Sequence, residues 1–194
     1  MSITVIKLGG SLMRNRNLGD WLTTIRSLAA MNNIIIVPGG GEFADKVRGM
    51  QSSLGFDDQT AHHLALLAMS QYGYLLAGMN KNLHIVEDLE SLSSSLDKNI
   101  PVLWLPTTLL TDGSEIPASW NYTSDSIALW LATKLAADRL VLIKAKVLRK
   151  IDASLEELIN NNILDKGFQQ FIDKFQGEIC LINARHYQEL KELF

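Results

Sequence analysis

The chain has 194 residues, of which 47% are hydrophobic and 20% charged, a balance typical of a folded globular protein. Its net charge is −3 without a basic block, so nucleic acid is not an expected partner. No apolar run approaches the ~18 residues of a membrane span, and the N-terminus lacks a signal-peptide pattern. We therefore expect one cytoplasmic domain, residues 1–194, with no membrane partner and, since Cys180 is the single cysteine, no disulfide within the chain.

Short runs rich in valine and isoleucine alternate along the chain with helical patterns. We expect buried strands at residues 3–8, 34–37, 83–86, 102–105, 140–143 and 179–182. We expect helices at residues 18–30, 42–50, 58–79, 124–137 and 154–160. Strands that lack polar alternation and are separated by helices are typical of a parallel sheet covered on both faces, so the predicted fold class is α/β.

The first predicted strand runs into glycine in the segment VIKLGGSL, residues 5–12. Lys7 lies inside this otherwise apolar strand. One interpretation is an edge-strand lysine whose amine reaches water. The other is a cation that contacts a bound phosphate, which the glycines beyond the strand favour.

The second predicted strand runs into three glycines in the segment IIIVPGGGEFAD, residues 34–45. One or two glycines suffice for a tight turn. Three glycines before a helix let the backbone approach a ligand closely and direct free N–H groups at an anion. The segment lacks the dinucleotide fingerprint and the Walker motif. Because ligands collect at the carboxyl ends of parallel strands, the two glycine loops predict a cradle for an anionic substrate and a phosphate donor.

Two further segments carry polar candidates. In NYTSDSIALWLATKLAADRLVLIK, residues 121–144, Thr123 or Ser124 is a plausible helix N-cap and Asp125 lies in the first turn. Alone, Asp125 fits an ordinary residue that complements the helix dipole. His62 and His63 point about 100° apart on a helix, so one of them can face a pocket. No spacing of His, Cys or acidic residues supports a metal site made by the protein.

Together these motifs resemble those of the amino acid kinase superfamily, which includes acetylglutamate, aspartate, uridylate, carbamate and isopentenyl phosphate kinases. The resemblance covers most of the chain. It implies a three-layer αβα sandwich with a mostly parallel central sheet, and transfer of the γ-phosphoryl group of ATP, with Mg²⁺, to a small acceptor. We also expect a homo-oligomer of two or more subunits.

The resemblance also implies roles for individual residues. Lys7 would bridge the donor and acceptor phosphoryl oxygens, and Asp125 would orient the glycine loops and lysines. The loop around the transferred phosphoryl group would consist of Gly9, Gly10 and Ser11. The acceptor side would consist of Gly39, Gly40, Gly41, Asn121 and Ser124, with His62 as a candidate contact of the acceptor phosphate.

One segment departs from the family pattern. Where the family has an acidic loop after the fifth strand, this chain reads IKAKVLRKID, residues 143–152. The acidic residues are replaced by Lys144, Lys146, Arg149 and Lys150. These basic side chains either bind phosphate groups, with Lys146 toward ATP, or form a solvated rim. The resemblance also implies a second catalytic lysine, for which Lys144 and Lys166 are the candidates. The altered loop leaves open that the protein binds ligands without catalysis.

The segments at residues 57–79 and 116–132 resemble more closely the small kinases of methanopterin biosynthesis. Those enzymes phosphorylate an aminomethyl-furanmethyl phosphate to the diphosphate. By this resemblance the acceptor is a phosphate group, and Glu42, Asp45 and Trp120 are candidates for the aminomethyl group. Uridylate kinase-like and isopentenyl phosphate kinase-like activities are the alternatives.

Overall fold

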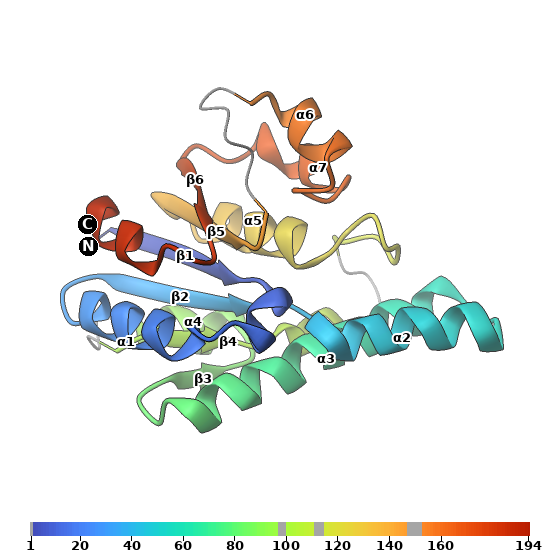
Figure 1. The fold of residues 1–194 in the computed structure, drawn as a ribbon, viewed down its shortest axis with the longest axis horizontal. Coiled ribbons are helices and arrows are strands. Elements are labelled where there is room, and N and C mark those ends of the chain that lie inside the picture. The colour runs from blue at the N-terminus through green and yellow to red at the C-terminus, as the bar shows by residue number, and fades with distance from the viewer. Residues whose placement is uncertain (1, 97–99, 111–114, 147–152) are drawn as a thin grey trace.

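The computed structural model describes residues 2–96, 100–110, 115–146 and 153–194 (Figure 1). Within these ranges six strands form one sheet, and every neighbouring pair is parallel. Their order across the sheet is β3 (His84–Val86), β4 (Val102–Trp104), β2 (Asn33–Pro38), β1 (Ile3–Leu8), β5 (Arg139–Lys144) and β6 (Glu178–Asn183). The predicted parallel sheet is confirmed, and each predicted strand end lies within one residue of the observed end.

Helices cover both faces of this sheet, which confirms the predicted three layers (Figure 1). The α-helices are α1 (Leu18–Ala29), α2 (Gly41–Leu54), α3 (Asp58–Met79), α4 (Leu89–Ser95), α5 (Ser124–Lys134), α6 (Leu155–Asn160) and α7 (Phe168–Ile172). Three 3-10 helices complete the described elements: η1 (Gly10–Arg14), η2 (Pro106–Leu110) and η3 (Tyr187–Leu193). Among the described residues, none of the helices combines the length and hydropathy that a membrane crossing requires.

The two faces of β1 belong to different halves of the core, because successive side chains of a strand point in opposite directions. Ile6 and Leu8 pack with the buried side chains of α1, whereas Val5 packs with those of α5. Lys7 alternates with Ile6 and Leu8, so its side chain lies on the α5 face. This parity places a buried cation beneath the N-terminal end of α5.

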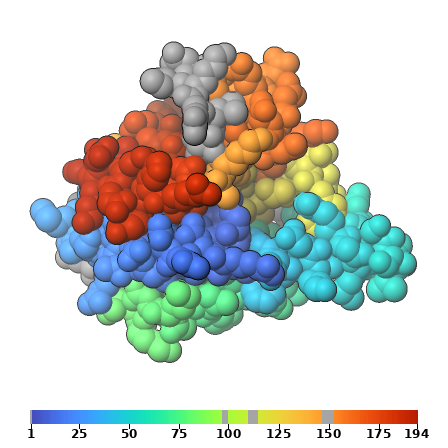
Figure 2. All heavy atoms as spheres, in the orientation of Figure 1, coloured from blue at the N-terminus to red at the C-terminus, as the bar shows by residue number. Residues whose placement is uncertain are grey.

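An arm projects beyond the carboxyl ends of the strands. It consists of α2 and the first half of α3, which pack side by side, and Figures 1 and 2 show it standing out from the body of the molecule. None of the residues of α2 is fully buried. The arm therefore forms one wall of the space above the sheet.

Two short helices are absent from the sequence prediction. The serine-rich helix α4 starts at Asp88, whose side chain accepts the Ser91 N–H at 2.7 Å. The hydroxyl groups of Ser93 and Ser94 donate to carbonyls four residues earlier in the same helix. Helix α7 spans only five residues and is held by buried Phe168 and Phe171. Tertiary contacts and caps, rather than periodicity, determine such short helices.

Helix α5 ends at Lys134 rather than at the predicted residue 137. The Ala137 N–H donates to the Ala132 carbonyl at 2.9 Å, and the Ala136 N–H donates to the Thr133 carbonyl at 3.1 Å. This is the Schellman pattern, which requires a left-handed residue just beyond the helix. Ala136 has φ of 46°, a conformation that alanine adopts at a cost.

We predict that Ala136→Gly stabilises the protein. Ala136 is exposed, so glycine removes the strain of the left-handed backbone without loss of packing, and we expect a gain of about 0.5–1 kcal/mol in the free energy of unfolding. Urea denaturation measures it. Ala30→Gly is the matched control, because Ala30 is also exposed but has φ of −61°, and it should destabilise. A lower urea midpoint for Ala136→Gly than for the wild type would contradict the prediction.

Candidate active site

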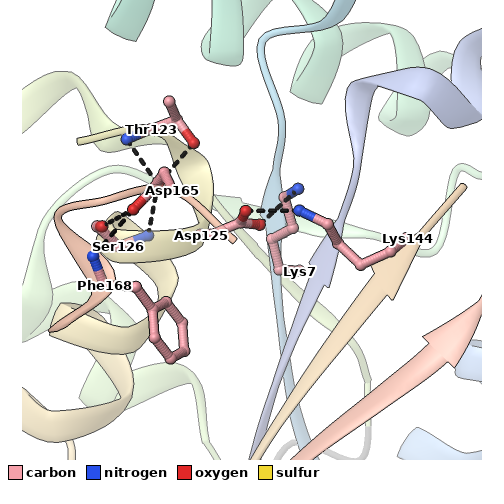
Figure 3. A network of polar contacts seen from close by, with 7 residues as sticks. All are labelled: Lys7, Thr123, Asp125, Ser126, Lys144, Asp165 and Phe168. Atoms are coloured by element: carbon pink, nitrogen blue, oxygen red, sulfur yellow. Dashed lines mark hydrogen bonds and ion pairs between the residues drawn. The ribbon is translucent and has the colours of Figure 1, made fainter. Parts of the chain in front are cut away.

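Three charged side chains meet beneath the first turn of α5 (Figure 3). Lys7 pairs in register with Leu142 of β5, and Lys144 lies two residues beyond Leu142, so both lysines occupy the same face. The Lys7 Nζ lies 2.9 Å from Asp125 Oδ1, and the Lys144 Nζ lies 2.5 Å from Asp125 Oδ2. The three side chains are 7%, 15% and 4% exposed for Lys7, Lys144 and Asp125. The interpretation of Lys7 as an edge-strand lysine is wrong, because β1 lies between β2 and β5.

The electrostatics of this ion-paired cluster follow from burial and from the excess of lysine. Burial raises the pKa of Asp125, but the neighbouring charges of Lys7 and Lys144 outweigh burial and hold that pKa below its ordinary value. For Lys144, burial and the Lys7 charge lower the pKa, and Asp125 only partly opposes them. Two lysines against one carboxylate leave excess positive charge at the carboxyl end of the sheet.

The two glycine loops contact each other directly beside this cluster. A Cβ atom on Gly10 would lie 2.1 Å from the Cα atom of Gly41, and one on Gly39 would lie 2.5 Å from the Gly10 nitrogen. Gly41 begins α2 with φ of 52°, which also favours glycine. The consecutive glycines are therefore needed largely because the backbones of the two loops pack directly against each other, with no room for side chains between them. Gly9 lies next to Lys7 rather than next to the second glycine loop, and a Cβ on Gly9 would be 3.4 Å from the Lys7 Nζ.

A cavity of about 380 Å³ opens between these loops, the arm and the start of α5. Nine residues predicted from the sequence as ligand contacts line it: Gly10, Ser11, Gly40, Gly41, Glu42, Asp45, His62, Trp120 and Ser124. Its apolar wall includes Leu66, Met69 and Ile127. The cavity thus combines a glycine-lined floor with an apolar wall and a polar rim, as small-molecule sites commonly do.

Of the two neighbouring histidines, His62 faces the cavity and His63 does not line it. The His62 side chain is buried, and its Nε2 atom has no hydrogen-bond partner among the described residues. Burial, followed by the charge of His63, lowers the pKa of His62. A buried ring nitrogen without a partner next to a cavity is suited to hydrogen-bond a ligand.

The rim of the cavity carries charged residues from η1 and α2. Arg14 forms a two-pronged ion pair with Glu42, so Glu42 is already neutralised. The guanidinium carbon of Arg48 lies 4.4 Å from the centre of the Trp120 ring. Asp45 also lines the cavity and is exposed. Of the two predicted carboxylates on the rim, Asp45 is the one outside an ion pair within the described part of the chain.

Some sequence candidates lie elsewhere. Asn121 is exposed and is not among the residues that line the cavity; its carbonyl accepts the Gly167 N–H at 2.7 Å. Lys146 and Lys166 are exposed and do not line the cavity either. Arg149 and Lys150 fall outside the described residues. Of the two candidates for a second lysine, Lys144 is the one that joins Asp125.

Sequence reasoning missed several residues. Arg14 and Arg48 line the cavity, and the helical spacing of residues 41, 44, 45 and 48 on α2 was the signal for Arg48. Asp165 hydrogen-bonds the start of α5 but comes some forty residues later in the chain, so no local pattern indicates it. In the described part of the chain, no group of three His, Cys, Asp or Glu residues could hold a metal ion.

Comparisons with known proteins agree with this architecture. The chain is 28% identical over 201 residues to (5-(aminomethyl)furan-3-yl)methyl phosphate kinase of Methanocaldococcus jannaschii, covering 97% of this chain and 91% of that protein. The fold is similar to uridylate kinase of Archaeoglobus fulgidus, with a TM-score of 0.69 and 18% identity over 98% of this chain and 96% of the other. It is also similar to aspartate kinase of Synechocystis, with a TM-score of 0.65 and 13% identity over 95% of this chain and 38% of the other.

The strongest of these findings is a family match. Residues 2–146, three quarters of the chain and all of the segment from β1 to β5, match the model of the amino acid kinase family. That segment contains both glycine loops and the cluster of Lys7, Asp125 and Lys144. The chain therefore belongs to the amino acid kinase family and is a phosphotransferase of that family.

Proposed function

We propose that the protein transfers the γ-phosphoryl group of ATP to the phosphate of a small acceptor, and that this acceptor is an aminomethyl-furanmethyl phosphate. The observation that carries the proposal is the buried cluster of Lys7, Asp125 and Lys144 beside two glycine loops. The 28% identical relative, a kinase named for this aminomethyl-furanmethyl phosphate, supports the choice of acceptor.

The transfer needs positioning and positive charge more than covalent help from the protein. An oxygen of the acceptor phosphate attacks the γ-phosphorus of ATP, the bond from that phosphorus to the β–γ bridging oxygen breaks, and ADP leaves. Lys7 and Lys144 stabilise the negative charge that spreads over the transferred group. Asp125 holds the two ammonium groups apart and in place, and the N–H groups of the glycine loops orient the phosphates.

The acceptor occupies the cavity between the arm and α5 in this proposal. Its phosphate lies toward Gly10, Gly40 and Gly41, where backbone groups approach closely, and the Nε2 atom of His62 donates or accepts one hydrogen bond. The furan ring packs against the apolar wall. Asp45 is the carboxylate available to the ammonium group of the acceptor, because Glu42 is paired with Arg14.

ATP and magnesium fit the residues present in different ways. Lys7, Lys144 and the loop of Gly9, Gly10 and Ser11 are suited to the phosphates of ATP. Both oxygens of Asp125 contact lysines, so this carboxylate is not a free metal ligand. Any Mg²⁺ would therefore be held by phosphate oxygens and water rather than by this carboxylate, and it would supply charge neutralisation on the phosphates, as is common in kinases.

The first test compares acceptors. We expect the enzyme to form the diphosphate from ATP and aminomethyl-furanmethyl phosphate, and to turn over UMP and isopentenyl phosphate much more slowly. ³¹P NMR measures the product in each case. Asp45→Asn should raise KM for the amine-bearing acceptor about tenfold, because the loss of one charged contact costs about 1.4 kcal/mol. The same substitution should leave KM unchanged for the analogue that carries a hydroxymethyl group instead of the aminomethyl group. Faster turnover of UMP would instead favour the uridylate kinase-like alternative. Binding of ATP and acceptor without turnover would favour the non-catalytic one.

The second prediction concerns the charge of Lys7. We expect Lys7→Met, which keeps a side chain of similar length in β1, to lower kcat at least ~100-fold, because loss of one donor to transition-state charge costs about 3 kcal/mol. Steady-state kinetics measure it, and circular dichroism verifies the fold. Lys81→Met, an exposed lysine in the turn after α3, is the control and should retain activity. Near-normal kcat in a folded Lys7→Met protein would remove Lys7 from the proposed mechanism.

A third prediction follows from the lowered pKa of Lys144. The ammonium form exists below that pKa, so as pH rises kcat should fall before the ordinary lysine value of 10.5 is reached. Lys144→Arg stays charged throughout, because the pKa of a guanidinium lies well above that of a lysine, and it should move the alkaline limb of the kcat profile to higher pH even if its maximal rate is lower. An alkaline limb at the same pH in both proteins would exclude Lys144 as its cause.

A further inference from the structure

The first turn of α5 is capped from a distant segment. Thr123 is the N-cap residue, but its own side chain accepts no capping hydrogen bond. The Asp165 Oδ2 atom, from the segment between α6 and α7, accepts the Thr123 N–H at 2.8 Å, the Thr123 hydroxyl at 2.7 Å and the Ser126 N–H at 3.1 Å. Asp165 thus satisfies N–H groups at the helix start that have no partner within the helix.

The other oxygen of the same carboxylate ties this turn to α7. Asp165 Oδ1 accepts the Ser126 hydroxyl and the Phe168 N–H, the latter at 3.0 Å. The segment packs tightly beside these bonds, because a Cβ on Gly167 would lie 2.2 Å from the Tyr122 ring. One carboxylate therefore joins the start of α5, the start of α7 and the chain between α6 and α7.

Asp125 lies between the two residues that Asp165 holds. In Figure 3 Asp165 contacts one side of the turn through Thr123 and Ser126, and the Asp125 carboxylate points from the other side toward the two lysines. A shift of this turn would move the Asp125 oxygens relative to Lys7 and Lys144. The distances of 2.9 and 2.5 Å in that ion-paired cluster thus depend on where Asp165 holds the helix.

Asp165 occupies a place that is costly for a carboxylate. Burial, followed by the negative charge of Asp125, raises the pKa of Asp165. A residue at position 123 can cap a helix locally, as Asp88 does for α4 and Asp57 does for α3. A local cap would therefore suffice to begin α5, and it would avoid the cost of placing a partly buried carboxylate beside Asp125.

We propose that Asp165 is a positioning residue, which fixes the first turn of α5 and through it holds the Asp125 carboxylate between Lys7 and Lys144. The consequence for phosphoryl transfer rests on the proposed function. The hydrogen-bonded clamp itself rests only on the contacts of Asp165.

The test uses Asp165→Asn in the full chain. Asparagine has the same shape, but its amide group offers only one acceptor oxygen, so the donors at Thr123, Ser126 and Phe168 cannot all be satisfied. We expect kcat to fall ~10- to 100-fold, since a displacement on the order of 1 Å can cost that much, with a smaller change in KM for ATP. Asp88→Asn is the matched control: it makes the same chemical change at the N-cap of α4, where one acceptor oxygen satisfies the Ser91 N–H, and it should leave kcat unchanged.

Hydrogen exchange gives a readout that does not depend on catalysis. The amides of residues 123–127 should exchange faster in Asp165→Asn and at the wild-type rate in Asp88→Asn. Ser126→Ala removes one donor to Asp165, so it should lower kcat and speed the exchange of these amides by smaller amounts. This variant replaces Asp165→Asn in the test if Asp165→Asn fails to fold. Unchanged exchange, or a fall in kcat no larger than in Asp88→Asn, would overturn the positioning role. A wild type inactive on every acceptor would refute the proposed function, and exchange alone would then decide whether the clamp exists.

Discussion

The carboxylate of Asp125, shared between two lysines, is the interaction on which the arrangement of the site depends. Lys7 and Lys144 come from adjacent parallel strands, so without an anion between them two ammonium groups would face each other in a place that water barely reaches. A buried charge without a partner costs several kcal/mol, which makes the position of Asp125 a condition for folding as well as for chemistry. The start of α5 must therefore lie over β1 and β5.

The parallel sheet converts this local requirement into a binding site. All six described strands end on the same side, so the loops after β1 and β2 and the last residue of β5 meet there. The contact between Gly10 and Gly41 joins the two loops so closely that side chains are excluded. What remains for a ligand is the space between that floor, the arm of α2 and α3, and the first turn of α5.

The sequence predicted the sheet well because buried parallel strands are read from short apolar runs. It indicated Lys7 because a lysine inside an apolar strand is unusual, and it indicated Asp125 and the glycine loops because they open a helix or follow a strand. It left Lys144 and Lys166 as alternatives, since only the pairing of β5 with β1 decides which lysine reaches Asp125. Local patterns also could not exclude Asn121, whose position depends on the packing of the residues before α5 against Gly167.

Of the residues that sequence reasoning missed, Asp165 is the one that no local pattern indicates. Asp165 acts on Thr123 and Ser126 across about forty residues of chain, and nothing in the intervening sequence indicates that the two segments meet. Hydrogen bonds between distant segments depend on the assembled fold, whereas strand runs and glycine loops depend on their neighbours in the chain. The site thus combines two kinds of feature. Its charged residues and glycines follow from local sequence patterns, whereas the hydrogen bonds of Asp165 to α5 form only when α7 packs against α5. Changes in the segment between α6 and α7 are therefore transmitted to the lysines through a single helical turn, without contact with the ligands themselves.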